Sequence, residues 1–298
     1  MQSLSGTVGV HAGTEPAIQP LSVFILTKNE ENNLDACLAS ICGWCSDIHI
    51  VDSFSTDRTL EIAVKYGSQV WQHAFEGHTQ QRTWALHNLP FKNEWVMALD
   101  ADHRVTPELR DELINVFASP PRDIDGFYVK RRQIFRGRWI RFGGYYPKYM
   151  LKIFRHRNAY LDNNEFDYRF YVQGRTKDLK HDILEANLNE WQISFFIEKH
   201  NKFAGELAAE EFARRRGLRY VTKPSLLGTH DQRVLWLKVI WLRLPLFVRP
   251  FLYFFYRYFV RLGFLDGKQG AIFHFLQAFW FRLLVDIKLD EMREGSAS

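Results

Sequence analysis

Residues 21–41 read LSVFILTKNEENNLDACLASI, and this stretch decides the fold class. It begins with a short apolar strand, after which apolar residues recur at the spacing of one helix face. The same alternation continues along the chain, with further predicted strands at IHIV (48–51), QVWQ (69–72) and WVMAL (95–99). Strands that alternate with helices at such spacings predict an α/β fold whose mostly parallel sheet is covered on both faces.

The composition is that of a folded globular protein. The chain has 298 residues, of which 46% are hydrophobic, enough for one large domain or two smaller ones. Three cysteines do not suggest a disulfide scaffold, and Cys42-Gly43-Trp44-Cys45 is interpreted as loop packing rather than a redox motif. Residues 1–20 lack the basic start and apolar core of a secretion signal, so we expect a flexible tail and a cytoplasmic location.

The pattern changes after residue 124. Residues 126–142 (GFYVKRRQIFRGRWIRF) and 149–155 (YMLKIFR) predict antiparallel strands with a glycine turn. A helical pattern returns over residues 188–216, and an apolar, aromatic segment follows from residue 231 to residue 290.

Polar residues follow three of the predicted strands at the point where each ends. They are Thr27-Lys28-Asn29-Glu30, Asp52-Ser53 and Asp100-Ala101-Asp102. A D-x-D pair alone carries little weight, because Asp123-Ile124-Asp125 is a second copy. In open parallel sheets, however, the carboxyl ends of the strands face one crevice where ligands bind. Three polar strand ends therefore favour a binding site over solvated turns.

The chemistry of these side chains suits a nucleoside diphosphate. Asp52 can accept hydrogen bonds from a base, and Asp100 can take a ribose hydroxyl. Asp102 can offer oxygen to a hard divalent cation that also binds phosphates. Arg82, early in a predicted helix, can add positive charge beside the diphosphate. The chain has no G-x-G-x-x-G and no P-loop sequence, which disfavours those nucleotide sites.

Four segments together carry a family resemblance: LSVFILTKNEENNLDACLASI (21–41), IHIVDSFSTDRTLEIAVKYG (48–67), QQRTWAL (80–86) and VMALDADHRVTPEL (96–109). In order and spacing they resemble the nucleotide-binding half of family-2 inverting glycosyltransferases. The resemblance implies a GT-A fold, a nucleotide-sugar donor and a divalent metal, Mg²⁺ or Mn²⁺. A sugar-nucleotide pyrophosphorylase is disfavoured, because it would need a glycine-rich loop where Thr27-Lys28-Asn29-Glu30 stands.

Three later segments resemble a bacterial subgroup that assembles lipopolysaccharide core or exopolysaccharide: GGYYPKYMLKIFR (143–155), WQISFFIEKHNKFA (191–204) and GFLDGKQGAIFHFLQAFWFRLLVDIKL (263–289). The subgroup implies transfer of a hexose, from a donor expected to be UDP-linked, to a lipid-linked or lipopolysaccharide-type acceptor. We therefore expect a nucleotide-sugar-binding half at 21–122, an acceptor-binding half at 123–217 and a basic aromatic region for membrane association at 218–298.

The resemblance also assigns roles position by position. It places Thr27, Asn29, Glu30 and Asp52 around the nucleoside, Arg82 near the base or diphosphate, Asp100 near the ribose, and Asp102 on the metal. Where the family often has glutamate after D-x-D, this chain has His103, which is interpreted as a packing residue more readily than as a ligand.

The resemblance also indicates a catalytic base. The subgroup commonly has a His-Glu pair ahead of a Gly-Arg or Gly-Lys turn, and here the matching residues are Asn163-Asn164-Glu165 before Gly174-Arg175. Glu165 is therefore the candidate that takes the proton of the acceptor hydroxyl. Asp162 and Asp167 are near enough in sequence to compete for this role.

The C-terminal segment combines basic and aromatic residues. Between Asp231 and Asp290 there are nine Lys or Arg and four Asp, in a stretch rich in Trp, Phe and Tyr. No run reaches the roughly 18 uncharged apolar residues of a spanning helix. On a helix after Pro250, one face would carry Tyr253, Arg257 and Arg261, and the other Phe251, Phe255 and Leu262.

This pattern favours peripheral attachment to the inner face of the cell membrane, with aromatic residues in the headgroup region and basic residues toward lipid phosphates. Ordinary core packing is the alternative. A nucleic-acid partner is not expected, because no recognisable binding module accompanies the charge. One reading from another class stays open: a non-catalytic glycan- or membrane-binding module that keeps the fold, motivated by His103 and the missing histidine before Glu165.

Overall fold

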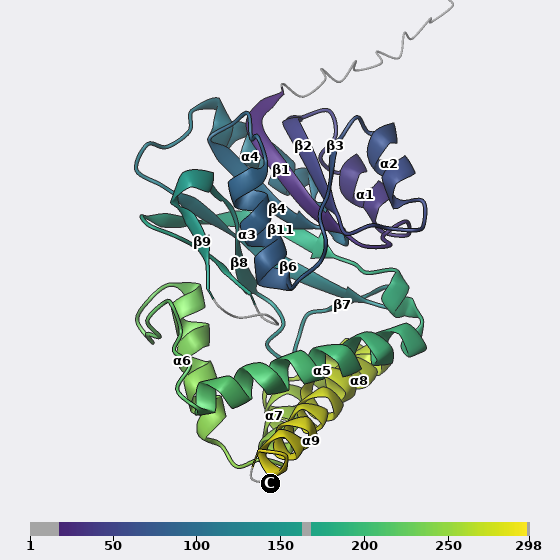
Figure 1. The fold of residues 1–298 in the computed structure, drawn as a ribbon, viewed down its shortest axis with the longest axis vertical. Coiled ribbons are helices and arrows are strands. Elements are labelled where there is room, and N and C mark those ends of the chain that lie inside the picture. Colours follow the sequence, from purple (N-terminus) through teal and green to yellow (C-terminus); the bar gives the residue numbers. More distant parts are fainter. Residues whose placement is uncertain (1–17, 163–167, 297–298) are drawn as a thin grey trace, which may run out of the picture.

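A mixed β-sheet forms the centre of the molecule (Figure 1). The computed structural model describes residues 18–162 and 168–296. Four parallel strands form one half of the sheet in the order β3-β2-β1-β4. They are β1 (Gln19–Thr27), β2 (Cys45–Asp52), β3 (Gln69–Gln72) and β4 (Trp95–Asp100). The predicted strands and their parallel arrangement are thus confirmed.

The other half of the sheet is mostly antiparallel. Its strands are β5 (His103–Val105), β6 (Gly126–Phe135), β7 (Arg138–Ile140), β8 (Lys148–Arg155) and β11 (Thr176–Glu185). Strand β8 lies antiparallel between β4 and β6, and β11 runs parallel to β6. Short β5 then pairs antiparallel with β11, which brings His103 opposite Glu185. The predicted hairpin with a glycine turn is β6–β7.

Helices cover both faces of the sheet, as predicted. On one face, α1 (Leu34–Ala39), α2 (Thr59–Lys65) and α4 (Pro107–Ala118) pack against the strands in one apolar cluster. On the other face, α3 (His78–Asn88) packs beside the small sheet of β9 (Ala159–Leu161) and β10 (Phe170–Val172). Between β8 and β9 lies one 3₁₀ turn, η1 (His156–Asn158).

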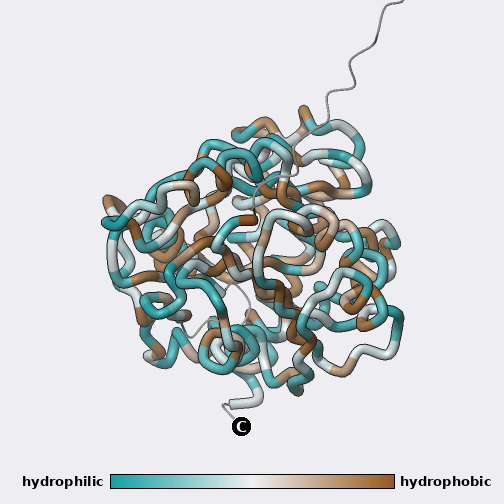
Figure 2. Tube along the Cα trace, turned by 90° about the horizontal axis from the view of Figure 1, so that it is seen from above, coloured by the Kyte–Doolittle hydropathy of each residue, from teal (hydrophilic) through white to brown (hydrophobic). Residues whose placement is uncertain are grey.

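Strand β1 shows why both faces of the sheet are covered. Leu21, Val23 and Ile25 belong to the cluster on one face, whereas Phe24 belongs to the cluster on the other. Successive side chains of a strand point to opposite faces, so a strand that is apolar at nearly every position needs an apolar partner on each side. Seen from above, much of the hydrophobic chain lies toward the middle of the molecule (Figure 2).

A layer of helices lies below the sheet in Figure 1 and crosses beneath it. It begins with η2 (Asn189–Trp191) and α5 (Ile193–Arg215), followed by α6 (His230–Arg243) and α7 (Arg249–Phe255). The chain then continues through η3 (Tyr256–Val260), η4 (Gly263–Asp266), α8 (Gly267–His274), η5 (Phe275–Trp280) and α9 (Phe281–Glu294). Helices α5 and α9 share one apolar cluster, so the helical layer includes a helix that precedes residue 218.

Gly263–Glu294 forms one continuous helical segment of 32 residues that is long and apolar enough, by length and composition alone, to cross a membrane. Part of its surface is occupied, because Val285 and Leu289 pack in the apolar cluster shared with α5. A core helix of a soluble protein would meet the same criterion.

Two basic residues of the C-terminal segment face the protein, contrary to the expectation that they point toward lipid. The guanidinium of Arg249 is buried and pairs with Glu211 and Asp286. Arg257 donates to the Gly143 carbonyl at 2.6 Å and lies over the Tyr145 ring. Phe251 and Phe255 are exposed while Arg257 faces inward, as the predicted faces require. The prediction fails farther along the chain, because α7 ends at Phe255 and Arg261 is exposed like Leu262. The orientation differs because buried carboxylates, carbonyls and rings inside the protein attract the cations.

Candidate active site

The polar strand ends meet at one edge of the sheet, as predicted. Residue Thr27 pairs with Asp52 in the β1–β2 register, and Leu26 pairs with Asp100 in the β1–β4 register. The turn after β4 then carries Asp102. This edge, with the loops that follow β1, β2 and β4, is called the crevice below.

Two loops at the crevice are locked together. Thr27 Oγ1 donates to Asp52 Oδ1 at 2.9 Å, and the backbone N–H of Ser55 donates to Asp52 Oδ2 at 2.8 Å. Asn29 adopts a left-handed φ of 55°, and its side-chain oxygen accepts from the Thr56 N–H at 2.8 Å. Asp52 is therefore fully buried and holds the loops, while Asn29 is exposed at the rim.

Asp100 is a partly buried carboxylate surrounded by positive charge. Lys152 Nζ donates to its Oδ2 at 2.9 Å, and Arg82 pairs with its Oδ1. Burial disfavours the charged form, but Lys152 and Arg82 outweigh it and hold the pKa of Asp100 well below its usual range. Arg82 is itself buried, with its guanidinium carbon 3.4 Å from the centre of the Tyr168 ring. The structure thus brings Arg82 and Asp100 together as an ion pair.

Asp102 and Glu30 differ from Asp100, because their pKa values are raised rather than lowered. Burial and, to a smaller extent, the neighbouring Glu185 carboxylate raise the pKa of Asp102 to about 6. Burial also raises the pKa of Glu30 to about 7, although Asn33 donates to its Oε2 at 2.7 Å. Among the described residues, no cation lies within ion-pair distance of either carboxylate. Lys199 acts on both carboxylates from beyond ion-pair distance, so their negative charge is only partly offset by the protein.

His103 packs beneath the crevice and connects its two sides. Its ring is buried, and Nδ1 accepts the backbone N–H of Asp100 at 3.0 Å. Because Nδ1 is an acceptor, the ring proton of the neutral imidazole sits on Nε2, which lies 3.3 Å from Glu185 Oε2. The interpretation as a packing residue is thus refined: His103 fixes the D-x-D turn to the end of β11.

Sequence reasoning missed two charged residues of the crevice. Glu185 ends β11 and accepts from Arg131 at 2.6 Å; Arg131 and His103 outweigh the effect of burial and hold the pKa of Glu185 below its ordinary value. Glu185 follows apolar residues of a strand, and the same pattern in the sequence identified Asp100 as a candidate. Lys152 interrupts the apolar strand YMLKIFR, and a lysine buried in a strand needs a charged partner. That partner, Asp100, becomes visible only when β8 pairs with β4.

The oxygen atoms at this edge fit a hard divalent cation. Asp102 and Glu185 are neighbouring carboxylates, and the Ala186 N–H donates to the Asp102 carbonyl at 2.9 Å, which fixes the two chains side by side. Within residues 18–162 and 168–296, no cluster of three acidic, histidine or cysteine residues could form a complete protein cage. Mg²⁺ commonly takes only one or two carboxylates and completes its shell with phosphate and water. The donor set suits that mode of binding.

The proposed base falls outside the described residues. Glu165 and Asp167 belong to residues 163–167, so their placement stays a prediction. The competing Asp162 is buried and accepts from the Tyr171 hydroxyl at 3.1 Å. Cys42 and Cys45 are free thiols, consistent with the packing interpretation of the C-x-x-C sequence.

Comparison with known proteins identifies the family. Residues 22–182 match the family described as Glycosyl transferase family 2, which is more than half of the chain. The chain belongs to this family, and the predicted GT-A fold is confirmed by the family and the sheet described above.

Relatives match parts of the chain. A lipopolysaccharide core biosynthesis glycosyltransferase, LpsC, of Rhizobium meliloti (strain 1021) is 36% identical over 118 residues, 38% of this chain and 42% of the relative. An uncharacterized glycosyltransferase of Rickettsia bellii (strain RML369-C) is 34% identical over 110 residues, 37% of each chain. The match thus spans about two fifths of the length of these curated relatives.

Solved structures show more distant similarity. Glucosyl-3-phosphoglycerate synthase from Mycobacterium tuberculosis, in complex with Mn²⁺, UDP and glucosyl-3-phosphoglycerate, is 20% identical with a TM-score of 0.31, over 39% of this chain and 44% of that one. S. aureus TarS is 19% identical with a TM-score of 0.38, over 62% of this chain and 39% of that one.

Proposed function

We propose that this protein is an inverting glycosyltransferase that moves a hexose from a nucleotide sugar, UDP-linked, to a lipid-linked or lipopolysaccharide-type glycan. The observation that carries the proposal is the acidic crevice, where Asp102, Glu30 and Glu185 gather beside the strand ends of a family-2 fold. The LpsC relative supports the acceptor class.

Each group of residues in the crevice would have its own role in binding the donor. Asp102 and Glu185 would hold a divalent cation, Mg²⁺ or Mn²⁺, which when bound supplies positive charge to the departing diphosphate. Thr27, Asn29, Glu30 and Asp52 would shape the nucleoside site. Asp100, kept ionised by Lys152 and Arg82, would accept a ribose hydroxyl.

Inversion requires one base on the acceptor side of the sugar. That base takes the proton of the acceptor hydroxyl while its oxygen attacks the anomeric carbon, and the bond to the diphosphate breaks on the opposite face. Glu165 remains the proposed base. Asp162 is a weaker candidate, because it is buried and already hydrogen-bonded to Tyr171.

We propose membrane attachment through the exposed apolar residues of α7, η3, η4 and η5, called the aromatic surface. They are Phe251, Leu252, Phe255, Phe259, Val260, Phe264, Leu265 and Phe275. A monomer rarely exposes so many large apolar side chains on neighbouring elements. Since Arg249 and Arg257 face inward, burial of aromatic side chains would drive binding more than attraction between these cations and lipid phosphates. The protein would then be cytoplasmic and peripheral on the inner face of the membrane.

The decisive test is binding and turnover. Calorimetry with UDP and Mn²⁺ should show metal-dependent binding, and screening of nucleotide sugars should identify a donor that is hydrolysed or transferred. Absence of UDP binding, with and without Mn²⁺, would favour a non-catalytic glycan- or membrane-binding module instead. Sedimentation with phosphatidylcholine vesicles tests the aromatic surface: Phe255→Ser/Phe259→Ser should reduce binding, and unchanged binding would remove this assignment.

A further inference from the structure

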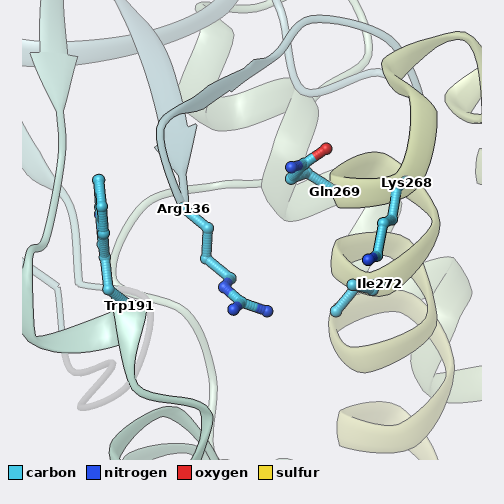
Figure 3. A pocket seen from close by; sticks show the side chains of 5 residues that line it. All are labelled: Arg136, Trp191, Lys268, Gln269 and Ile272. Atoms are coloured by element: carbon cyan, nitrogen blue, oxygen red, sulfur yellow. The ribbon is translucent and has the colours of Figure 1, made fainter.

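A cavity separate from the crevice lies between the β6–β7 hairpin, η2 and the start of α8 (Figure 3). Its volume is about 230 Å³, and it is lined by Arg136, Trp191, Lys268, Gln269 and Ile272. At about 30 Å³ per water molecule, this is roughly the space of eight waters. The cavity is therefore large enough for one sugar ring and is open to solvent.

The cavity is positively charged without internal compensation. In the described part of the chain, no carboxylate lies within ion-pair distance of Arg136 or Lys268. Figure 3 shows the Arg136 guanidinium between Trp191 and the helix that carries Lys268. Helix α8 begins at Gly267 with the buried Asp266 at its N-cap position, so that carboxylate already offsets the positive end of the helix dipole. The side chains of Arg136 and Lys268 are both exposed, so solvent screens their repulsion and an anion from solution can reach both of them.

Arg136 holds its position at a conformational cost. It forms a two-residue turn with Gly137, and both have left-handed φ angles of 48° and 77°. Asn and Gly are preferred at these positions, because a larger side chain disfavours positive φ. Among the described residues, Arg136 has no hydrogen-bond partner that would explain an arginine here. The left-handed conformation of Arg136 therefore destabilises the turn, while it places the guanidinium at the cavity.

Trp191 gives the cavity an apolar wall. Its side chain is 52% exposed and lies against Gly137, where an added Cβ would be 3.7 Å from Trp191 Cζ2. An exposed indole offers a flat surface on which the C–H face of a sugar ring can pack. The Gln269 amide supplies a donor and an acceptor for hydroxyl groups.

The cavity also adjoins the crevice through η2. Asn189 Oδ1 accepts from Asn32 in the loop after β1 at 2.8 Å, and Glu190 accepts from Lys199 at 2.9 Å. Lys199 interacts electrostatically with Asp102. One 3₁₀ turn thus has residues facing the crevice at its start and Trp191 in the cavity at its end.

We propose that this cavity binds an anionic sugar of the acceptor glycan, one that carries a phosphate or a carboxylate. The anion would pair with Arg136 and Lys268, and the ring would pack on Trp191. The identification of the ligand as part of the acceptor rests on the proposed glycosyltransferase function.

Titration of the full chain with single sugars tests this directly. Ligand-observed NMR would compare glucose 6-phosphate and glucuronate with glucose. We expect the charged sugars to bind at least about tenfold more tightly than glucose, and to lose affinity as salt is raised. Equal affinity for the three sugars, or no binding, would overturn the proposal.

Variants separate the cavity from its surroundings. Arg136→Gly should weaken binding of the charged sugars about tenfold while keeping or raising Tm, because glycine suits the left-handed turn. Lys268→Ala should have a similar effect on binding, and Trp191→Ala should weaken binding of all three sugars. Arg138→Ala is the matched control, since Arg138 is exposed on the same hairpin but does not line the cavity. Charged-sugar binding unchanged by Arg136→Gly and Lys268→Ala would contradict the assignment.

Two further measurements identify the source of the anion and separate the anion site from the proposed glycosyltransferase function. If Arg136→Gly lowers binding to phosphatidylglycerol-containing vesicles but leaves sugar binding intact, the cavity takes a lipid headgroup and the glycan proposal is wrong. UDP binding with Mn²⁺ should be the same in wild type and all cavity variants. A wild type that binds charged sugars at this cavity but not UDP would refute the proposed function and leave the anion site standing.

Discussion

The crevice and the helical layer both contain charged side chains removed from solvent, but they differ in how those charges are paired. In the helical layer, the buried guanidinium of Arg249 pairs with two buried carboxylates, those of Glu211 and Asp286. In the crevice, burial leaves Asp102 and Glu30 with raised pKa values and no cation at ion-pair distance among the described residues. Removal of one partner from a buried ion pair destabilises the fold, whereas a buried carboxylate without an ion-pair partner is a candidate ligand site.

The largest expected effect is in the helical layer. Arg249→Ala leaves two carboxylates buried without their cation, which should lower the free energy of unfolding by about 3–5 kcal/mol. Chemical denaturation measures this, with Arg243→Ala as the control, since Arg243 is exposed at the end of α6. If Arg249→Ala lowers the free energy of unfolding no more than Arg243→Ala does, the ion pairs of Arg249 do not stabilise the fold.

In the crevice, the corresponding substitution should affect activity and spare the fold. Asp102→Asn removes a carboxylate that the protein does not pair, so transfer should fall about 100-fold or more while Tm stays equal or rises. Asp123→Asn, in the second D-x-D sequence, is the matched control because Asp123 is exposed and pairs with Arg175 at 2.7 Å. Full activity of Asp102→Asn would remove the metal assignment.

His103 gives a finer test, because its two ring nitrogens can be mimicked separately. Asn at this position can still accept the Asp100 N–H but cannot reach Glu185, whereas Gln can reach Glu185. We expect His103→Asn to weaken Mn²⁺ binding about tenfold and His103→Gln to weaken it less, with similar Tm for both. Equal Mn²⁺ affinities in the two variants would show that the contact with Glu185 does not position a ligand.

The smallest effect concerns pH. The pKa of Glu30 is raised from its ordinary value to about 7, so its protonated form stabilises the fold. That stability is complete below about pH 4 and is lost as pH rises through 7. The full shift corresponds to about 3 kcal/mol, and partial exposure of Glu30 reduces the expected change to roughly 1–2 kcal/mol. Glu30→Gln should flatten the dependence of Tm on pH between 5 and 8, and identical curves for the two proteins would contradict the raised pKa.

The parallel half of the fold was predictable from sequence because its signals are local. Strand β1 and helix α1 are visible in 21–41, and Thr106 caps α4 as its position before Pro107 suggests. Asp52, Asp100 and Asp102 meet at one edge because parallel strands end together. Glu185 and Lys152 were missed because their neighbours come from β5, β6 and β4, and no local pattern states that β8 lies between β4 and β6.

The aromatic C-terminal segment shows a second limit of prediction from sequence. Helical periodicity correctly separated Arg257 from Phe255, but periodicity does not say which face points inward. The carbonyl of Gly143 and the ring of Tyr145, more than a hundred residues earlier in the chain, decide that.

The segment 185–191 has one consequence for coupling between the crevice and the cavity. It begins with Glu185 beside Asp102 and ends with Trp191 on the wall of the cavity, and only residues 186–188 separate β11 from η2. A ligand in the crevice that moves Glu185 can therefore change the position of Trp191. If binding at one site changes the affinity at the other, linkage requires the reverse effect to have the same factor. Titration with UDP and glucose 6-phosphate, each in the presence and absence of the other, would measure that factor.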